Sequence, residues 1–230
     1  MNFRIFDSIN ELVEAAAATL LAEAEKTDTL VVALSGGTTP KSLYELMGRA
    51  PLRDRLGRRK ITWVTGDERC VPPDHAQSNS RMIHESLFRE GISEGHRFVR
   101  FRTELTDPVA IEEQFNAEWA EQASGQIDLA ILGMGEDGHT ASLFPDTAVL
   151  EVEDRASAAV WVPRLESWRV TLTIPQLRDA RSKWVLAAGE GKRPMIERIR
   201  RGEDFPITRV AENGSESWWF VDRAAYPGIT

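Results

Sequence analysis

Few cysteines, no excess of positive charge and no long apolar run mark this 230-residue sequence, and each shortage excludes a class of protein. The single cysteine, Cys70, permits no internal disulfide, so we expect a reducing compartment and a cytoplasmic location. The formal net charge of -8 argues against a nucleic-acid or anionic-membrane partner, whose binding surface would be basic. No apolar stretch is long enough to cross a bilayer, and Asp7, Glu11 and Glu14 lie where a secretory leader would be apolar, so we expect neither a membrane span nor a leader.

The sequence also lacks the spacing of a metal or nucleotide site. Its four histidines are scattered, and neither HExxH nor paired cysteines occur, so we expect no metal and no cofactor. No lysine follows the early glycines at P-loop spacing. The pattern Gly133-x-Gly135-x-x-Gly138 matches a dinucleotide fingerprint only weakly, because a charge and an imidazole interrupt the turn.

What the chain does contain is an alternation of short aliphatic runs with amphipathic segments. The runs predict strands at 29–34, 61–65, 97–101, 127–132, 158–162, 169–174, 183–188 and 217–222, the last of them at a sheet edge. Helices are expected from Ser8 to about 26, from Pro40 to about 49, and at 79–88, 108–122 and 194–201. This order predicts a three-layer α/β/α fold, with a mostly parallel, Rossmann-like sheet covered by helices on both faces. We expect residues 1–230 to form a single domain.

The stretch from 127 to 145 is the most informative. A buried strand is followed by three glycines, then by Asp137 and His139, where open α/β sheets place their ligands. A helix is expected to begin at 140–144, limited by Pro145. His139 is therefore a candidate general base. The alternative is that His139 only caps a helix or bonds a loop carbonyl.

Two more polar loops follow predicted strands. Ser35-Gly36-Gly37-Thr38-Thr39-Pro40 opens a helix that Thr38 or Thr39 can cap, and such a loop offers backbone N–H groups to an anion. The alternative is an ordinary tight turn.

After the strand at 61–65 comes Asp67-Glu68-Arg69-Cys70. For such a triplet of charges a surface ion pair is the usual interpretation, but its place at the expected sheet edge of His139 favours a functional cluster. We interpret Cys70 as a packing thiol rather than a nucleophile.

With these loops identified, the chain resembles the 6-phosphogluconolactonases of the single-domain α/β type, which share a superfamily with glucosamine-6-phosphate deaminase and ribose-5-phosphate isomerase. Five segments carry the resemblance: Ser35 to Pro40, Gly66 to Pro72 with Ser78-Asn79, Gly133 to Pro145, Arg169 to Thr173, and Ala188 to Arg193. The resemblance implies hydrolysis of 6-phospho-D-glucono-1,5-lactone to 6-phosphogluconate in the oxidative pentose phosphate pathway.

The resemblance also implies roles for particular residues. His139 would be the general base, Arg69 and Asp67 would belong to the catalytic cluster, and Asp137 or Asp67 would orient the imidazole. The sugar phosphate would be held by a second set: Ser35, Gly36, Gly37, Thr38, Arg169 and Lys192. The expected partner is this small sugar-phosphate lactone alone, and the sequence carries no signal for an oligomeric state.

Two other functions are compatible with the same loops. A glucosamine-6-phosphate deaminase would follow Asp-Gly-His with Ile-Ala-Phe-Asn-Glu-Pro, whereas this chain has Phe144 at the position of that glutamate. A non-enzymatic sugar-phosphate sensor on the same fold would not need Asp67, Arg69 and His139 together. For any of these functions, the residues following four strands (Ser35, Asp67, His139 and Gly189) are expected at one sheet edge.

Overall fold

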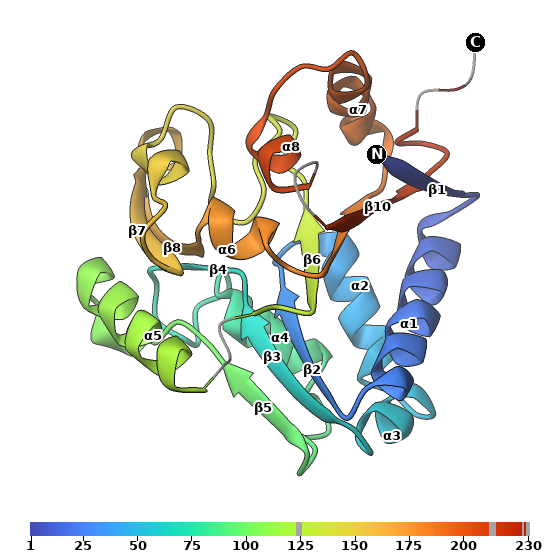
Figure 1. Cartoon of the computed structure of the whole chain (residues 1–230), viewed down its shortest axis with the longest axis horizontal. Helices are drawn as coiled ribbons and strands as arrows, with labels where there is room; N and C mark the ends of the chain where they lie inside the picture. The colour runs from blue at the N-terminus through green and yellow to red at the C-terminus, as the bar shows by residue number, and fades with distance from the viewer. Residues whose placement is uncertain (123–125, 212–214, 227, 229–230) are drawn as a thin grey trace.

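Seven parallel strands form the main sheet in the computed structural model, which describes residues 1–122, 126–211, 215–226 and 228 (Figure 1). In spatial order they are β1 (Asn2–Phe6), β10 (Glu216–Asp222), β9 (Ser182–Ala187), β6 (Leu129–Gly133), β2 (Thr29–Leu34), β3 (Lys60–Thr65) and β5 (His96–Val99). The first strand of the chain thus pairs with the last. On this basis we propose that residues 1–230 form one domain.

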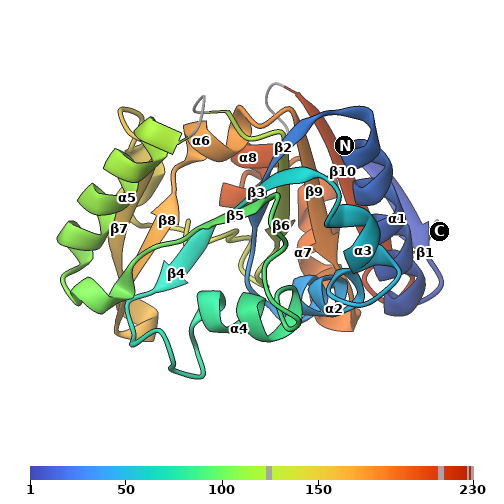
Figure 2. The same cartoon turned by 90° about the horizontal axis from the view of Figure 1, so that it is seen from below.

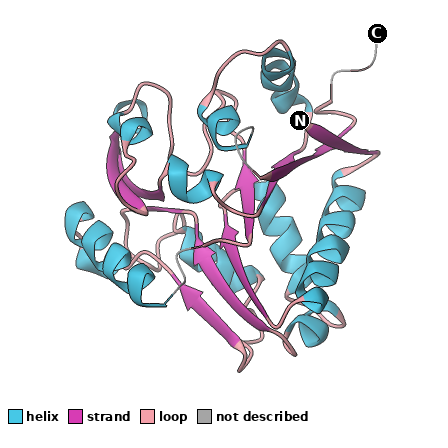
Figure 3. Cartoon of the chain, viewed as in Figure 1, coloured by secondary structure: helices cyan, strands magenta, loops and turns pink. Residues whose placement is uncertain are grey.

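Helices cover both faces of this sheet, which confirms the three-layer prediction (Figures 2 and 3). One face packs against α1 (Ile9–Lys26), α2 (Thr38–Met47), α3 (Leu52–Leu56) and α4 (Asn79–Ser86). The other face packs against α5 (Pro108–Gln122), α6 (Ile174–Arg178), α7 (Arg193–Arg200) and α8 (Pro206–Ala211). Successive strand residues alternate between these layers, as the period of two requires: Val32 contacts the first and Ala33 the second.

A second, antiparallel sheet of three strands lies on the face of α5 to α8. It consists of β4 (Asp67–Arg69), β8 (Ser167–Leu172) and β7 (Ser157–Val162). The sequence predicted β7 and β8 as strands but did not separate them from the parallel sheet. Only the short turn η3 (Pro163–Leu165) and Glu166 join them, and a parallel pair would need a crossover of about a dozen residues or more.

Three local predictions were wrong. The strand near the C-terminus is not at an edge, because β1, which the sequence analysis did not predict, pairs with its outer side. Gly37, with φ of 103°, is the N-cap of α2, so neither Thr38 nor Thr39 caps that helix. Residues 140–144 do not begin a helix: Ala141 has φ of 49°, and Thr140 and Leu143 form an isolated bridge.

The strand order reverses at β2, which lies between β3 and β6. In parallel α/β sheets, the loops that follow the two adjacent strands at such a point, here β2 and β6, leave toward opposite faces of the sheet. A crevice remains between them at the carboxyl ends of the strands. Here those loops begin at Ser35 and at Met134. Asp67 and Gly189 follow β3 and β9 at the same edge, which confirms that the four polar loops share one side of the sheet. Within the described residues, no helix is both long and apolar enough to cross a membrane.

Glu68 holds the start of α4 beside this edge. Its buried carboxylate accepts hydrogen bonds from the backbone N–H groups of Asn79 and Ser80, both at 2.7 Å, and from the Ser78 hydroxyl at 3.1 Å. Asp67 is buried as well. The alternative that this triplet is a surface ion pair is therefore excluded, since two of its three charges are inside the protein.

Replacing Glu68 tests this anchor. Glu68→Gln keeps the shape but turns one acceptor oxygen into an N–H donor that faces backbone N–H groups. We expect the free energy of unfolding to fall by about 1–3 kcal/mol in urea titrations, the usual cost of a buried hydrogen-bonding group left without its partner. Glu85→Gln, an exposed change on the same helix that removes an ion pair with Arg81, should cost less than about 1 kcal/mol. Equal, small losses for both would contradict the anchoring role of Glu68.

Candidate active site

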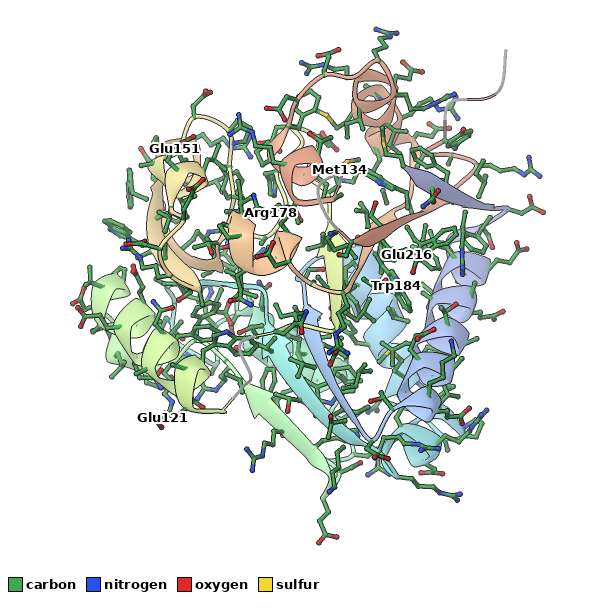
Figure 4. All side chains as sticks on the ribbon, viewed as in Figure 1. Glu121, Met134, Glu151, Arg178, Trp184 and Glu216 are labelled. Atoms are coloured by element: carbon green, nitrogen blue, oxygen red, sulfur yellow. The ribbon has the colours of Figure 1, made fainter. Side chains whose placement is uncertain are left out.

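A cavity of about 250 Å³ lies at the carboxyl edge of the sheet, where β2 and β6 diverge. Figure 4 labels Met134, which follows β6 and lines this cavity. Nine of the ten residues predicted for the site also line it: Ser35, Gly36, Gly37, Thr38, Asp67, Arg69, His139, Arg169 and Lys192. The tenth, Asp137, does not line the cavity but contacts His139 from behind.

A tight turn after β6 fixes the position of His139. The Gly135 N–H donates to the His139 carbonyl at 2.8 Å, which closes the turn on itself. Gly138 has φ of 78°, and a Cβ there would meet the Phe205 ring at 2.8 Å. A Cβ on Gly135 would lie 2.1 Å from His139 Nδ1. Glycine is thus required at both positions, because the backbone bends sharply at one and the imidazole packs directly on the other.

The imidazole of His139 is held on two sides. Nδ1 lies 2.5 Å from Asp137 Oδ1, and the ring stacks on Phe144 with centroids 4.1 Å apart. A carboxylate at Nδ1 favours the tautomer that carries the proton on Nδ1. Nε2 has no hydrogen-bond partner among the described residues, so it can accept a proton from a molecule in the cavity.

Asp137, rather than Asp67, is the carboxylate in contact with the imidazole. Burial alone would raise the pKa of Asp137, but the hydrogen bonds and charge of His139, together with the charge of Arg164, outweigh burial and lower the pKa to about 2. Arg164 Nη2 lies 2.6 Å from Asp137 Oδ2. Asp137 is therefore a fixed anion at neutral pH.

Asp67 has different partners. Its Oδ1 accepts a hydrogen bond from Asn79 Nδ2 at 3.0 Å, and its Oδ2 accepts one from the Ser142 hydroxyl at 2.6 Å. Its side chain is buried in the cavity wall. The sequence left open whether Asp137 or Asp67 orients His139, and the geometry gives this contact to Asp137.

Two arginines occupy paired positions on neighbouring strands of the antiparallel sheet. Arg69 on β4 is the cross-strand partner of Arg169 on β8, and both line the cavity. Burial and the positive charge of Arg69 lower the pKa of Arg169. Arg69 donates to the Gln77 carbonyl, while its Nε is buried and has no partner among the described residues. Two cations placed so close repel each other, and an anion between them would remove that repulsion.

The loop after β2 supplies neutral donors. The buried Tyr44 hydroxyl donates to the Ser35 carbonyl at 3.0 Å and so ties the loop to α2. The Ser35 hydroxyl of this loop and the Thr140 hydroxyl of the segment after β6 are buried at the cavity and have no hydrogen-bond partner in the part of the chain that the structure describes. Residues 38–40 form the first turn of α2, whose positive dipole end faces the same space.

Lys192 adds a further positive charge to the lining of the cavity. It ends the short 3₁₀ turn η4 (Glu190–Lys192) after β9 and lines the cavity. Across the described residues, no carboxylate lies within 4.0 Å of its ammonium group.

Cys70 is a poor nucleophile here. It packs partly against the core, and burial and the negative charge of Glu68 raise the pKa of its thiol to about 11 against the opposing charge of Arg169. The thiol is therefore protonated at neutral pH, as the interpretation of a packing cysteine requires.

Four side chains that shape the site were not assigned a role from the sequence: Asn79, Ser142, Phe144 and Arg164. Asn79, Ser142 and Phe144 lie inside the motifs that carried the resemblance, so their positions were noticed but not their contacts. Nothing in the sequence distinguished Arg164, because it is one of 28 lysines and arginines and lies in a turn between two strands.

No group of three or more His, Cys, Asp and Glu side chains within the described ranges is arranged to hold a metal ion. The expectation that the site works without a metal stays a prediction.

Comparison with known proteins identifies the family of the chain. The family model described as glucosamine-6-phosphate isomerases/6-phosphogluconolactonase matches residues 7–219. A 6-phosphogluconolactonase of Chlamydia trachomatis is 35% identical over 227 residues, covering 94% of this chain and 86% of that protein. The crystal structure of 6-phosphogluconolactonase from Thermotoga maritima superposes with a TM-score of 0.81 at 29% identity, covering 96% of this chain and 99% of that one. That from Leishmania guyanensis gives 0.83 at 26% identity, covering 100% and 98%. The chain belongs to the glucosamine-6-phosphate isomerase/6-phosphogluconolactonase family.

Proposed function

We propose that this protein hydrolyses 6-phospho-D-glucono-1,5-lactone to 6-phospho-D-gluconate, a step of the oxidative pentose phosphate pathway. The observation that carries the proposal is the imidazole of His139, with Asp137 on Nδ1 and a cavity lined by Arg69, Arg169 and Lys192 on its other side. The name 6-phosphogluconolactonase, given to relatives that align over nearly the whole chain, supports the same reaction.

In the proposed mechanism, neutral His139 accepts a proton at Nε2 from a water molecule as that water attacks the lactone carbonyl carbon. Negative charge develops on the carbonyl oxygen, and Arg69 or backbone N–H groups of the loops stabilise it. The bond between the carbonyl carbon and the ring oxygen then breaks. The imidazolium returns its proton to that ring oxygen, which becomes a hydroxyl of the open-chain product, and the enzyme is restored.

Asp137 has two functions in this scheme. Its hydrogen bond keeps the proton of neutral His139 on Nδ1, so that Nε2 is the basic atom. Its negative charge stabilises the imidazolium that forms during the attack. The depressed pKa of Asp137 supports both functions, since the carboxylate stays ionised throughout the cycle.

The phosphate group of the substrate is assigned to the cationic and N–H-rich part of the cavity. Arg169, Lys192 and residues 35–38 at the start of α2 offer charge and donors there. Binding the phosphate, which does not react, fixes the lactone carbonyl beside His139 and so contributes to the rate.

The family name also covers amino-sugar isomerases, so the deaminase is the nearest alternative. Phe144 argues against it: its ring stacks on His139 at the sequence position where the deaminase motif carries a glutamate. The direct test is a hydrolysis assay on freshly generated lactone, with glucosamine 6-phosphate tested for ammonia release beside it. Ammonia release without lactone hydrolysis would replace the proposal, and binding without either reaction would favour the sensor.

The phosphate assignment predicts that Lys192→Ala weakens binding of the product, 6-phosphogluconate, by about 10- to 100-fold in calorimetry. This corresponds to the loss of one charge-assisted contact, roughly 1.5–3 kcal/mol. Lys26→Ala, an exposed change at the end of α1, should leave the affinity unaltered. Equal affinities for both variants would remove Lys192 from the phosphate site.

We expect the reaction to need no metal ion, because the scheme assigns the charge of the carbonyl oxygen to Arg69 and loop N–H groups. Lactonase activity should then survive dialysis against a chelator. Initial rates before and after treatment are compared. Loss of activity that added divalent metal restores would overturn this expectation.

The base assignment predicts the largest effect for His139→Asn, which keeps polarity and approximate size but cannot take up the proton. We expect kcat to fall by roughly 10²–10⁴-fold, the usual contribution of a general base, with product affinity near normal. Spontaneous opening of the lactone must be subtracted. In the wild type, activity should decline toward acid pH as the imidazole becomes protonated.

His75→Asn is the matched control, because His75 is exposed in the turn that follows β4. It should retain full activity. If folded His139→Asn keeps more than half of the wild-type kcat, His139 has a structural role and the base must be sought at Asp67.

A further inference from the structure

Arg164 contacts both residues that hold the imidazole of His139, so that His139, Asp137, Arg164 and Phe144 form a closed cycle of four contacts. Asp137 divides its two oxygens, with Oδ1 2.5 Å from His139 Nδ1 and Oδ2 2.6 Å from Arg164 Nη2. The guanidinium carbon of Arg164 lies 4.7 Å from the centroid of the Phe144 ring, and Phe144 stacks in turn on His139. Both supports of the imidazole, the carboxylate and the aromatic ring, are therefore contacted by one arginine.

This arginine reaches the site from a distant element. It belongs to the turn η3 of the β7 to β8 hairpin, whereas the other three residues belong to the segment that follows β6. Arg164 does not line the cavity, and about half of its side chain is exposed. A molecule bound in the cavity would therefore meet His139 and not Arg164, so any effect of Arg164 on the reaction passes through its two neighbours.

We propose that Arg164 is a positioning residue for His139, which fixes Asp137 and Phe144 so that Nε2 stays directed at the cavity. The role of His139 as base rests on the proposed function; the positional claim rests on the contacts alone. The ion pair with Arg164 stops the Asp137 carboxylate from rotating away, and the cation over Phe144 keeps that ring against the imidazole.

The charged groups near His139 and Asp137 determine whether removal of Arg164 favours the protonated or the neutral imidazole. On the cavity side lie Asp67, Arg69, Arg169 and Lys192. On the other side of Asp137 lie Asp146, Glu151, Asp204, Arg198 and Arg209. In that second group Arg209 pairs with Asp204 and Arg198 pairs with Glu203. Arg164 is the cation that forms an ion pair with Asp137. Without Arg164, the negative charge of Asp137 is less compensated, and it stabilises the protonated form of His139 more strongly.

Arg164→Met tests the inference, because it removes the charge and keeps a side chain of similar length. The acid limb of the kcat/KM profile should move to higher pH by about 0.5–1 unit, as expected for losing one partly screened positive charge nearby. The plateau of kcat should fall by about 3- to 30-fold, since a displaced base reacts from a poorer geometry. Affinity for 6-phosphogluconate should stay within about twofold, because Arg164 does not line the cavity.

Arg55→Met is a closely matched control. Arg55 Nη2 lies 2.6 Å from Glu25 Oε1, and its side chain is 52% exposed, the same distance and exposure as for Arg164. It lies on α3, on the opposite face of the sheet. This control should move neither the acid limb nor kcat. Arg164→Lys, which keeps the charge but not the planar group, should return the acid limb to its wild-type position and recover part of kcat.

A second measurement does not depend on catalysis. The His139 imidazole is titrated by NMR in the ligand-free protein, for the wild type, Arg164→Met and Arg55→Met. Its midpoint should rise in Arg164→Met alone. If Arg164→Met does not fold, Arg164→Gln, which removes the charge and keeps a donor for Asp137, must give the same rise.

The outcomes separate the two proposals. A wild-type protein without lactonase activity, combined with a rise of the NMR midpoint in Arg164→Met, would reject the function and support the positioning role. An active wild type in which Arg164→Met moves neither the acid limb nor the midpoint would overturn the positioning role, even if kcat fell, because that fall would then be structural. A shift in Arg55→Met equal to that in Arg164→Met would also overturn it.

Discussion

The reversal of strand order at β2 is the constraint on which the site depends. Because β3 lies on one side of β2 and β6 on the other, the loops that leave β2 and β6 start side by side and then diverge. The loops are close at their origin, where a Cβ on Gly133 would lie 3.5 Å from the Gly36 carbonyl oxygen. They separate beyond that point, since α2 packs on one face and the His139 segment contacts the other. The cavity is the space between them, so its chemistry is fixed by which residues follow these strands.

Charge is distributed unevenly between this cavity and the rest of the molecule. The chain carries a net charge of -8, yet Arg69, Arg169, Lys192 and the first turn of α2 all face one small space. The nearby acid groups are already engaged: Asp67 by Asn79 and Ser142, Glu68 by the start of α4. Among the described residues, no carboxylate lies within 4.0 Å of the charged groups of Arg69, Arg169 or Lys192, so these cations form no direct ion pair and remain open to an anion in the cavity.

The sequence predicted the main sheet and the shared edge of the loops because these depend on local patterns. Aliphatic runs such as 29–34 mark buried parallel strands, and the carboxyl ends of parallel strands always meet at one edge. The pairing of β7 with β8 was not predicted, because a periodic run indicates a strand but not its partner. For the same reason Arg164 was missed: it contacts Asp137 only because that hairpin folds over the β6 loop. Residues 140–144 resembled a helix start, but the chain turns there so that Phe144 reaches the imidazole.

The contacts on the two oxygens of Asp137 explain why this partly buried carboxylate stays charged beside the proposed base. Burial opposes ionisation of Asp137, while His139 and Arg164 favour it, and the net result is a pKa of about 2. Sign matters here: a depressed pKa means that the carboxylate is charged at every pH well above about 2. Asp137 therefore presents a constant negative charge to the imidazole near neutral pH, and its own ionisation adds no limb to the activity profile there. The same carboxylate that fixes the ring can thus stabilise positive charge on it without competing for the proton.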